Sequence, residues 1–470
     1  HDLGTWDDIS ALSERFRLMF DGVVNHASRE SRWFEEWRAG HPDYADYFLE
    51  FDSPDDIPFD DLRKILRPRT TPLLSPTTTV NGPRWVWTTF SEDQVDLNFG
   101  NPKVLLEILS LLLYYVRRGA EVIRLDAVTY LWKELGTPCA HLPQTHASIK
   151  LMRAALDVVA PHVALVTETN VPHVDNVSYF GSGEDEAQMV YNFALPPLVL
   201  HTFQTGDATK LSHWARTLEP PSGSTHFLNF LSSHDGIGLM GARGILSEQE
   251  ILDMCQRAES HGGLVSMRSD PVHGQSPYEL NVTWYSALNR SDVGESTDLQ
   301  IDRFIASRAL ALVLKGVPGI YLPALIGSRN DIAAVKRSAS YRDINRSAIE
   351  ERVLGRLLRR PGSITRRVSD RFLRLLELRR DQPAFHPNSN QDVLDVGHGV
   401  FTLLRTPASG PPVLCLINVR AVPTRVRVAL GNAGLDGTLR DLVSDTTHEA
   451  PGGALDIEIS PYQVLWLKKD

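Results

Sequence analysis

Three carboxylates lie at the ends of three short apolar runs in the sequence. Asp126 ends the run in "VIRLDAV", Glu168 ends the run in "VALVTETN", and Asp235 closes the run in "FLSSHDG". In a parallel α/β barrel the carboxyl ends of all strands meet on one face, so acids at these positions would gather over one pocket. A single acid after a strand is more often a helix cap or part of a loop salt bridge. Three such acids together indicate a catalytic site, because grouping ionisable side chains is costly without a function.

Basic side chains accompany these acids in the same motifs. Arg124 precedes Asp126 by two residues, and on a strand this spacing puts both side chains on one face. A cation there would keep Asp126 ionised. His26 ends "DGVVNH" and His234 precedes the third acid. A lone histidine is more often a packed or capping residue, so these two indicate a site only because they accompany the three carboxylates.

The runs that carry these residues alternate with helical patterns, which is typical of repeated βα units and a parallel sheet. We expect strands in "LMFDGVVNH", "AEVIRLDAV", "HVALVTETN", "AQMVYNF", "HFLNFLSSHD" and "GIYLP". A helix is predicted over residues 101–118, where Asn101 can cap the first turn and Pro102 can occupy it. Another is predicted over residues 301–315, which have an apolar face.

The spacing of the motifs predicts the domain organisation. His26 and Asp126 are 100 residues apart, whereas Asp126 and Glu168 are 42 apart, the length of one βα repeat. We therefore expect a barrel that begins in residues 1–26 near a third strand, an inserted B domain over 27–98, and the rest of the barrel over 99–384. A long Gly-, Pro- and Ser-rich loop is expected over 240–300, and an antiparallel β domain over 385–470, where short alternating runs follow one another.

Composition excludes several classes of protein. Lys and Arg number 48 against 58 Asp and Glu, for a net charge of −10 without a dense basic cluster, so nucleic acid is not an expected partner. The longest apolar run, "VLLEILSLLLYYV", is too short and interrupted to cross a bilayer, so no membrane partner is expected either. Three widely spaced cysteines argue against a disulfide framework and favour a reducing, cytoplasmic location.

The blocks "DGVVNH", "IRLDAV", "TETN" and "LSSHDG" resemble, in this order and with these intervals, the four sequence blocks of the α-amylase superfamily, glycoside hydrolase family 13. The resemblance spans nearly the whole chain and implies a (β/α)8 TIM barrel with an inserted B domain and a C-terminal antiparallel β domain. "RPRTTPLL", "FALPPLVLH", "SPYELN" and "YRDINR" resemble the branch of sucrose phosphorylases, which move a glucosyl group between a small α-glucoside and inorganic phosphate with retention.

The resemblance assigns a role to each residue. It implies that Asp126 is the nucleophile that forms a covalent glucosyl ester and that Glu168 is the general acid and base. A retaining pair of this kind has carboxyl groups about 5 to 5.5 Å apart. Asp235 is implied as the transition-state stabiliser that holds sugar hydroxyls, while His26 and His234 match the sugar-binding histidines. Asn25 matches a position that many amylases use for calcium, but this branch generally lacks the metal, and we expect none.

The glucosyl ester can be broken by phosphate or by water, and the surrounding cations decide between them. Phosphate needs positive partners near the carboxylates, and arginine suits bidentate contact. The candidates are Arg67 and Arg69 in "LRPRTTP" and Arg329 in "LIGSRND", with Arg268 as a further option; each could equally form an ordinary surface salt bridge. The resemblance to relatives that act on anionic glucosides favours 2-O-α-glucosylglycerate, with sucrose and sucrose 6'-phosphate as alternatives. No cofactor is expected besides inorganic phosphate as co-substrate.

Two further alternatives stay open. The same carboxylates would serve a hydrolase or transglucosidase. The superfamily barrel also normally has two strands before the "DGVVNH" strand, and they are not found upstream of it here. We therefore expect either an N-terminally truncated sequence or a noncatalytic homologue with an open barrel, and the complete set of three carboxylates favours the enzyme. The sequence predicts no oligomeric state.

Overall fold

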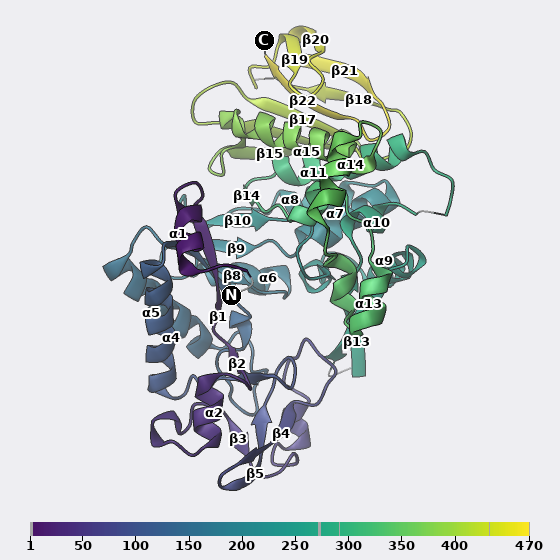
Figure 1. Cartoon of the computed structure of the whole chain (residues 1–470). Coiled ribbons are helices and arrows are strands. Elements are labelled where there is room, and N and C mark those ends of the chain that lie inside the picture. The colour runs from purple at the N-terminus through teal and green to yellow at the C-terminus, as the bar shows by residue number, and fades with distance from the viewer. Residues whose placement is uncertain (1–2, 271–273, 291, 432, 470) are drawn as a thin grey trace. The chain divides into compact units, whose positions relative to one another are not determined.

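The computed structural model describes residues 3–270, 274–290, 292–431 and 433–469 (Figure 1). The chain divides into two compact units, each of which is described by itself. The first unit comprises His1–Tyr191, Pro220–Thr225 and Met267–Tyr278. The second comprises Asn192–Glu219, His226–Ser266 and Glu279–Asp470.

The first unit is built on a parallel sheet. Its strands are β1 (Leu18–Val23), β7 (Ala120–Asp126), β8 (Ala164–Glu168) and β9 (Met189–Tyr191), each paired in parallel with the next. The apolar runs predicted as the first four strands therefore do form strands. Because neighbours are parallel, the acids at the ends of β7 and β8 come out at the same edge.

Helices connect these strands. They are α1 (Trp6–Ser13), α2 (Arg32–Arg38), α3 (Phe59–Leu62), α4 (Pro102–Arg117), α5 (Pro143–Val159) and α6 (His173–Val177). In α4 the Asn101 side chain accepts a hydrogen bond from the Lys103 amide and Pro102 fills the first position, which confirms the helix start predicted from the sequence. Helices α4 and α5 lie side by side (Figure 1).

Residues 27–98 form short antiparallel elements between β1 and α4. Strand β2 (His26–Ser28) pairs with β6 (Gln94–Asp96), while β5 (Gly82–Trp87) lies between β3 (Glu50–Phe51) and β4 (Leu74–Thr79). A small apolar core under these strands includes Ile57, Leu74 and Trp87. The pairing of β2 with β6 brings the two ends of the excursion together.

The second unit contains the parallel pair β10 (His226–Asn229) and β14 (Val317–Pro318). The strand expected in "GIYLP" is therefore wrong in position, because β14 ends at Pro318 and Leu322 already begins a helix. The helices are α7 (Leu195–Thr205), α8 (Thr209–Ala215), α9 (Glu248–Ser260), α10 (Trp284–Leu288), α11 (Thr297–Val313), α12 (Leu322–Leu325), α13 (Ile332–Ser338), α14 (Glu351–Arg359) and α15 (Ile364–Arg380). Helix α11 begins four residues before its predicted start, because Ser296 accepts a hydrogen bond from Leu299 and caps it.

The loop predicted over residues 240–300 is wrong as a description of most of this segment. It contains α9, whose Ser247 and Glu250 form a capping box, and the strands β12 (Leu264–Asp270) and β13 (Gly274–Asn281). Strand β11 (Ile237–Gly238) pairs with the end of β13. The turn signals misled the prediction because Gly, Pro and Ser here lie in and next to the strands of a partly buried hairpin. Residues 271–273 and 291 lie outside the described residues.

The C-terminal residues form antiparallel β-sheets. A six-stranded sheet has the order β15 (Asn390–Leu394), β16 (Val400–Thr406), β17 (Val413–Asn418), β22 (Val464–Lys469), β19 (Gly437–Asp441) and β20 (Thr447–Ala450). Strands β18 (Thr424–Ala429) and β21 (Ala454–Ile459) form a separate pair. Leucines and valines from both sheets pack into one apolar core.

Two negative findings apply to the residues that the structure describes. None of their helices is long and apolar enough to cross a membrane. The three cysteines are buried and unbridged, and burial raises the pKa of Cys255 to about 11.

Candidate active site

Asp126 and Glu168 are the last residues of two neighbouring strands of the first unit. The register pairs Asp126 directly with Glu168 across β7 and β8. In-register partners on adjacent parallel strands are about 4.8 Å apart and project from the same face. Both side chains are shielded, at 24% and 16% exposed. This spacing suits the carboxylate pair of a retaining glycoside-active enzyme.

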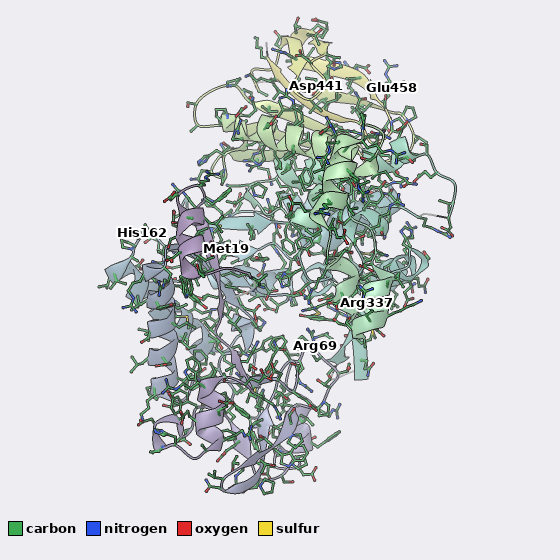
Figure 2. The ribbon with its side chains drawn as sticks, in the orientation of Figure 1. Met19, Arg69, His162, Arg337, Asp441 and Glu458 are labelled. Carbon is green, nitrogen blue, oxygen red and sulfur yellow. The ribbon has the colours of Figure 1, made fainter. Side chains whose placement is uncertain are left out.

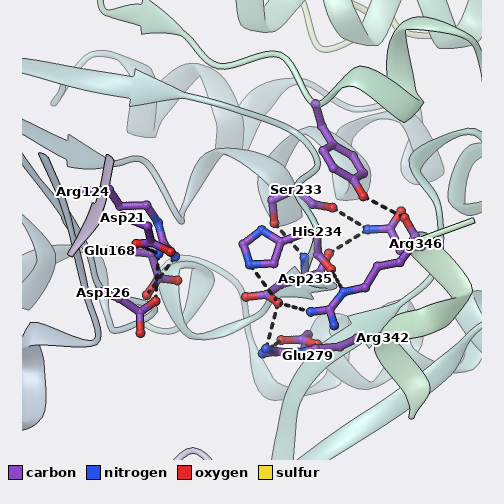
Figure 3. Close-up of polar contacts among 12 residues, drawn as sticks. Asp21, Arg124, Asp126, Glu168, Ser233, His234, Asp235, Glu279, Arg342 and Arg346 are labelled. Atoms are coloured by element: carbon purple, nitrogen blue, oxygen red, sulfur yellow. Dashed lines mark hydrogen bonds and ion pairs between the residues drawn. The ribbon is translucent and has the colours of Figure 1, made fainter. Parts of the chain in front are cut away.

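Arg124 binds this pair from below, as expected from its position two residues before Asp126. Its Nη1 lies 2.9 Å from Asp126 Oδ1 and 2.6 Å from Asp21 Oδ1, and its Nη2 lies 3.8 Å from Glu168 Oε2 (Figure 3). The guanidinium also covers the Tyr191 ring, with 5.6 Å to the centroid. Burial alone would lower the pKa of Arg124, but the three carboxylates outweigh burial and raise it. The cation is therefore permanent and shared among the acids.

The backbone turns sharply after Asp126. Ala127 has φ 53° and ψ 30°, in the left-handed region that residues other than glycine rarely adopt. Ala127 is also 7% exposed, so surrounding contacts hold this conformation. Strain of this kind is concentrated at functional sites, and here it aims the strand end that carries Asp126.

His26 lies in the same unit, at the start of β2. It is 7% exposed, and burial lowers its pKa even though Asp96 and Asp126 act in the opposite direction. The imidazole packs against the Phe90 ring at 5.3 Å, and Phe90 meets Tyr130 edge-to-face at 5.5 Å. A neutral histidine beside two aromatic rings is suited to hydrogen bonding a sugar hydroxyl.

Arg67 and Arg69 differ although they are two residues apart. Arg67 is 6% exposed and donates to the carbonyl oxygens of Thr71, Pro72 and Thr88, and burial lowers its pKa to about 10. It therefore holds its own loop together. Arg69, which is labelled in Figure 2, is only half-buried. Its guanidinium lies over the Phe90 and Tyr278 rings, 5.8 and 5.9 Å from their centroids.

Arg268 lies near Arg69. The Arg69 carbonyl accepts from the Ser269 amide and hydroxyl, which fastens the Arg69 loop to β12. The buried Tyr130 phenol has its pKa raised by burial and lowered again by Arg268 and Arg69, so both cations act on one phenol. Arg268 itself pairs with Asp270 at 3.3 Å. Of the sequence candidates, Arg69 and Arg268 are thus brought together with the His26 aromatic pair.

Asp235 lies in the second unit, where two arginines bind one of its oxygens. Arg342 Nη1 is 2.8 Å and Arg346 Nη2 3.1 Å from Asp235 Oδ1 (Figure 3). The other side of Arg342 makes a bidentate pair with the buried Glu279, at 3.1 and 2.7 Å. His234, 56% exposed, has its Nε2 3.6 Å from the same Asp235 oxygen.

The backbone of this loop is held by the same segment. Asn345 donates to the carbonyl oxygens of Ser233 and Asp235 at 2.6 and 2.8 Å, and Arg346 donates to that of His234 at 2.7 Å. The 3₁₀ turn Tyr341–Asn345 and the residue after it thus fix the backbone conformation of the "SSHD" loop.

The position after Asp235 has room only for glycine, because the backbone of Leu280 passes close to Gly236. A Cβ at this position would lie 2.5 Å from the Leu280 carbonyl oxygen and 2.6 Å from Glu279 Cγ. Any side chain would push β11 away from β13 and displace the partner of Arg342.

Arg329 lies elsewhere within the second unit. It is exposed, and its guanidinium covers the Tyr285 ring at 5.4 Å. The neighbours that act on the Tyr285 phenol besides Arg329 are Arg367 and Glu295, neither of which belongs to the Asp235 cluster. Its role as a phosphate ligand stays a prediction.

Several residues of both clusters were not predicted. Asp21, Tyr191 and Phe90 accompany Arg124 and His26, and Glu279, Arg342 and Arg346 surround Asp235. Asp21 could have been found from its position in "FDGVVNH", where it shares the register of Arg124. "YRDINR" was noticed as a motif, but its two arginines were given no role because nothing local shows which acid they meet.

The chain is similar to known proteins along most of its length. The protein-family model described as "Alpha amylase, catalytic domain" matches residues 1–237 of this chain. The glucosylglycerate phosphorylase of Spirochaeta thermophila is 44% identical over 471 residues, covering 99% of this chain and 79% of the relative. That of Escherichia coli K12 is 42% identical, covering 99% and 81%.

A solved structure supports the fold. Sucrose 6F-phosphate phosphorylase from Thermoanaerobacter thermosaccharolyticum superposes with a TM-score of 0.76 at 24% identity, covering 88% of this chain and 82% of the other. The fold class is therefore the (β/α)8 barrel with a C-terminal antiparallel β sheet, as the motifs predicted. With its four blocks, its strand-end carboxylates and these relatives, the chain belongs to the α-amylase family.

Proposed function

We propose that the protein is a retaining α-glucoside phosphorylase that transfers a glucosyl group from 2-O-α-glucosylglycerate to inorganic phosphate. The observation that carries the proposal is the in-register pair of Asp126 and Glu168 with Arg124 bound to both. Relatives named glucosylglycerate phosphorylases, at 42 to 49% identity, supply the substrate class.

In the first half-reaction Asp126 is the nucleophile. Arg124 binds and orients the Asp126 carboxylate, an oxygen of which attacks the anomeric carbon as the bond to the glycerate oxygen breaks. Glu168 gives its proton to that oxygen, and glycerate leaves as an alcohol. The product is a β-glucosyl ester of Asp126.

In the second half-reaction Glu168 acts as the base. Its carboxylate takes the proton of an incoming hydrogen phosphate, whose oxygen attacks the anomeric carbon and releases Asp126. Two inversions give net retention and therefore α-glucose 1-phosphate. Water would use the same steps and give free glucose, so the competition is decided by what holds phosphate.

Arg69 is the proposed anion ligand. Among the described residues its guanidinium donates one hydrogen bond, to the Pro68 carbonyl, and it lies over two aromatic rings, which leaves further N–H groups for a ligand. The Phe90 ring that it covers also packs against His26, a proposed glucosyl-binding residue. The same cation can first hold the glycerate carboxylate and then phosphate. Arg67 supports the loop, and Arg329 is retained only as a weaker candidate.

Asp235 is proposed to hold sugar hydroxyls as positive charge develops on the ring. Its ion pairs with Arg342 and Arg346 hold the carboxylate in place, and His234 is proposed to bind the sugar beside it.

The remaining features follow from this reaction. No cofactor is proposed beyond phosphate as co-substrate, and the ligands are small molecules. The three buried thiols support a reducing, cytoplasmic location.

The test compares donors with and without phosphate. The protein is incubated with 2-O-α-glucosylglycerate, sucrose or sucrose 6'-phosphate, and glucose 1-phosphate and free glucose are measured. We expect phosphate-dependent glucose 1-phosphate, fastest with glucosylglycerate. Free glucose formed at the same rate without phosphate would make the protein a hydrolase, and a preference for sucrose 6'-phosphate would change the substrate but not the reaction.

A further inference from the structure

A lysine ammonium is buried in the first unit, beside His26. Lys133 has 4% of its side chain exposed, and its Nζ lies 2.9 Å from Asp96 Oδ2 and 3.0 Å from Asn25 Oδ1. Burial lowers the pKa of Lys133, and the Asp96 carboxylate counteracts that effect. A cation in such a place is costly unless its partners are fixed.

Its partners are fixed. Asp96 is fully buried and accepts further hydrogen bonds from the Thr89 amide and hydroxyl, at 2.8 and 2.7 Å, and from Asn25 Nδ2 at 3.0 Å. The Asp96 carboxylate thus receives four donors, and of these four only Lys133 carries a full positive charge.

A bound metal ion is the alternative source of positive charge beside Asn25 and Asp96. Asn25 matches a position that many amylases use for calcium, and calcium takes six to eight oxygens at about 2.3 to 2.6 Å. Here both candidate oxygens face an N–H donor at hydrogen-bond distance. In the described part of the chain no group of three or more His, Cys, Asp or Glu could hold a metal. The residues do not fit the metal, because the chain supplies the positive charge itself.

Lys133 also fixes the Asn25 amide. Since Oδ1 accepts from the ammonium, Nδ2 must face Asp96, and it also lies 3.3 Å from His26 Nδ1. On the other side of the imidazole, Gln94 Nε2 lies 2.8 Å from His26 Nε2. The ring thus meets an amide nitrogen at both of its nitrogens.

A neutral imidazole accepts at one nitrogen and donates at the other, so one of these amides must turn its oxygen to the ring. Asn25 cannot turn, because that would place its NH₂ against an ammonium. The Gln94 oxygen is held by the Ser91 hydroxyl at 2.8 Å, and a hydroxyl accepts as well as it donates. The Gln94 amide therefore turns its oxygen toward His26, and the His26 proton resides on Nε2.

We propose that Lys133 is a positioning residue whose ammonium replaces a metal ion between Asn25 and Asp96 and, through the Asn25 amide, holds the His26 proton on Nε2. This inference rests on the proposed function only for the role of His26 itself, which is to contact the glucosyl group. Loss of Lys133 removes the donor to Asn25 Oδ1 and leaves Asp96 alone to orient the Asn25 amide, which weakens the hold on the His26 tautomer.

The test is the tautomer of His26, read from the ¹⁵N shifts of its ring in protein labelled at histidine and assigned with His26→Gln. We expect the Nε2–H form in the wild type and a mixture or the Nδ1–H form in Lys133→Met. Lys150→Met is the matched control, since Lys150 is half-exposed and pairs with Asp185, and it leaves His26 unchanged. An Nδ1–H wild type, or an unchanged His26 in a folded Lys133→Met, overturns the inference.

A second variant covers the case in which Lys133→Met does not fold. Asn25→Asp retains an oxygen for Lys133 but replaces the Nδ2 donor with an acceptor, so we expect His26 to hold a proton on Nδ1. Retention of the wild-type tautomer in this variant contradicts the inference.

The metal part is tested on the wild-type protein by its melting temperature in EDTA or in millimolar Ca²⁺. We expect no shift, and a rise with Ca²⁺ or a fall with EDTA refutes a built-in cation. Neither readout involves a substrate, so the proposed function can fail without affecting this inference. With an active enzyme, Lys133→Met is expected to lower kcat/KM about tenfold.

Discussion

The Arg342 bridge offers the sharpest test of how the Asp235 loop is held. Arg342 binds Asp235 with one nitrogen and Glu279 with two others, and Glu279 is 2% exposed. Arg342→Met therefore leaves a carboxylate buried with neither of those hydrogen bonds. Breaking a buried pair in this way costs about 3 to 5 kcal/mol, and the lower end applies because the Arg342 side chain is 27% exposed.

Glu279→Gln separates the two roles of the bridge. In the double variant the buried charge is gone, so we expect about 2 kcal/mol of the lost stability to return. The kcat/KM should stay about tenfold or more below that of the wild type, because Asp235 still lacks a charge-assisted hydrogen bond from Arg342. Arg346 continues to hold Asp235 in both variants.

Urea titration followed by tryptophan fluorescence measures the stability, and initial rates of phosphorolysis measure kcat/KM. Arg371→Met is a control, because Arg371 and its partner Asp302 are both exposed, at 43% and 37%, and an exposed ion pair contributes at most about 1 kcal/mol to stability. The reasoning is refuted if Arg342→Met is no less stable than this control, or if the double variant regains full activity.

Three further predictions follow from the same contacts. Arg69→Gln should raise the KM for phosphate and shift the products toward free glucose by about tenfold or more, whereas Arg67→Gln should mainly lower stability, because Arg67 is committed to carbonyl oxygens; equal product ratios in the two variants would contradict this division. Glu168→Gln should slow turnover of glucosylglycerate far more than that of a glucosyl donor with an acidic leaving group, because such a group needs no proton, and uniform loss would remove Glu168 from the acid role. Burial lowers the pKa of a set of histidines, so below about pH 6.5 the unfolded chain binds protons that the folded chain does not. The free energy of unfolding should therefore be highest above about pH 6.5 and decrease as the pH falls below it. Asp185 and Glu250, with pKa values lowered to about 2, affect stability only in stronger acid. Those histidines are His26, His141, His173, His201, His226 and His261, and a melting temperature that stays flat between pH 7 and 5 would contradict their contribution.

The strand ends were the part of the molecule that local sequence could predict. Apolar runs that stop at Asp126 and Glu168 have the length of buried strands, and parallel strands in one sheet leave their last residues side by side. Arg124 followed from the two-residue period of the same strand. These inferences needed only the periodicity of a strand and the chirality of the fold.

Contacts between distant segments could not be predicted in this way. The sequence does not show that Arg342 meets Asp235 more than a hundred residues earlier, or that Arg329, equally cationic, covers Tyr285 instead. Lys133 was overlooked because a lysine after a strand is usually exposed, and only the pairing of β2 with β6 brings Asn25 and Asp96 around it. "GIYLP" failed because a short apolar run fits a strand and a helix start equally well.

The most direct test of the central claim is the anomeric form of the first product. ¹H NMR of a fresh reaction with 2-O-α-glucosylglycerate and phosphate should show α-glucose 1-phosphate from the earliest spectra, and Asp126→Asn should form none. The β-anomer as first product, or undiminished turnover by Asp126→Asn, would contradict a double displacement through Asp126 and Glu168.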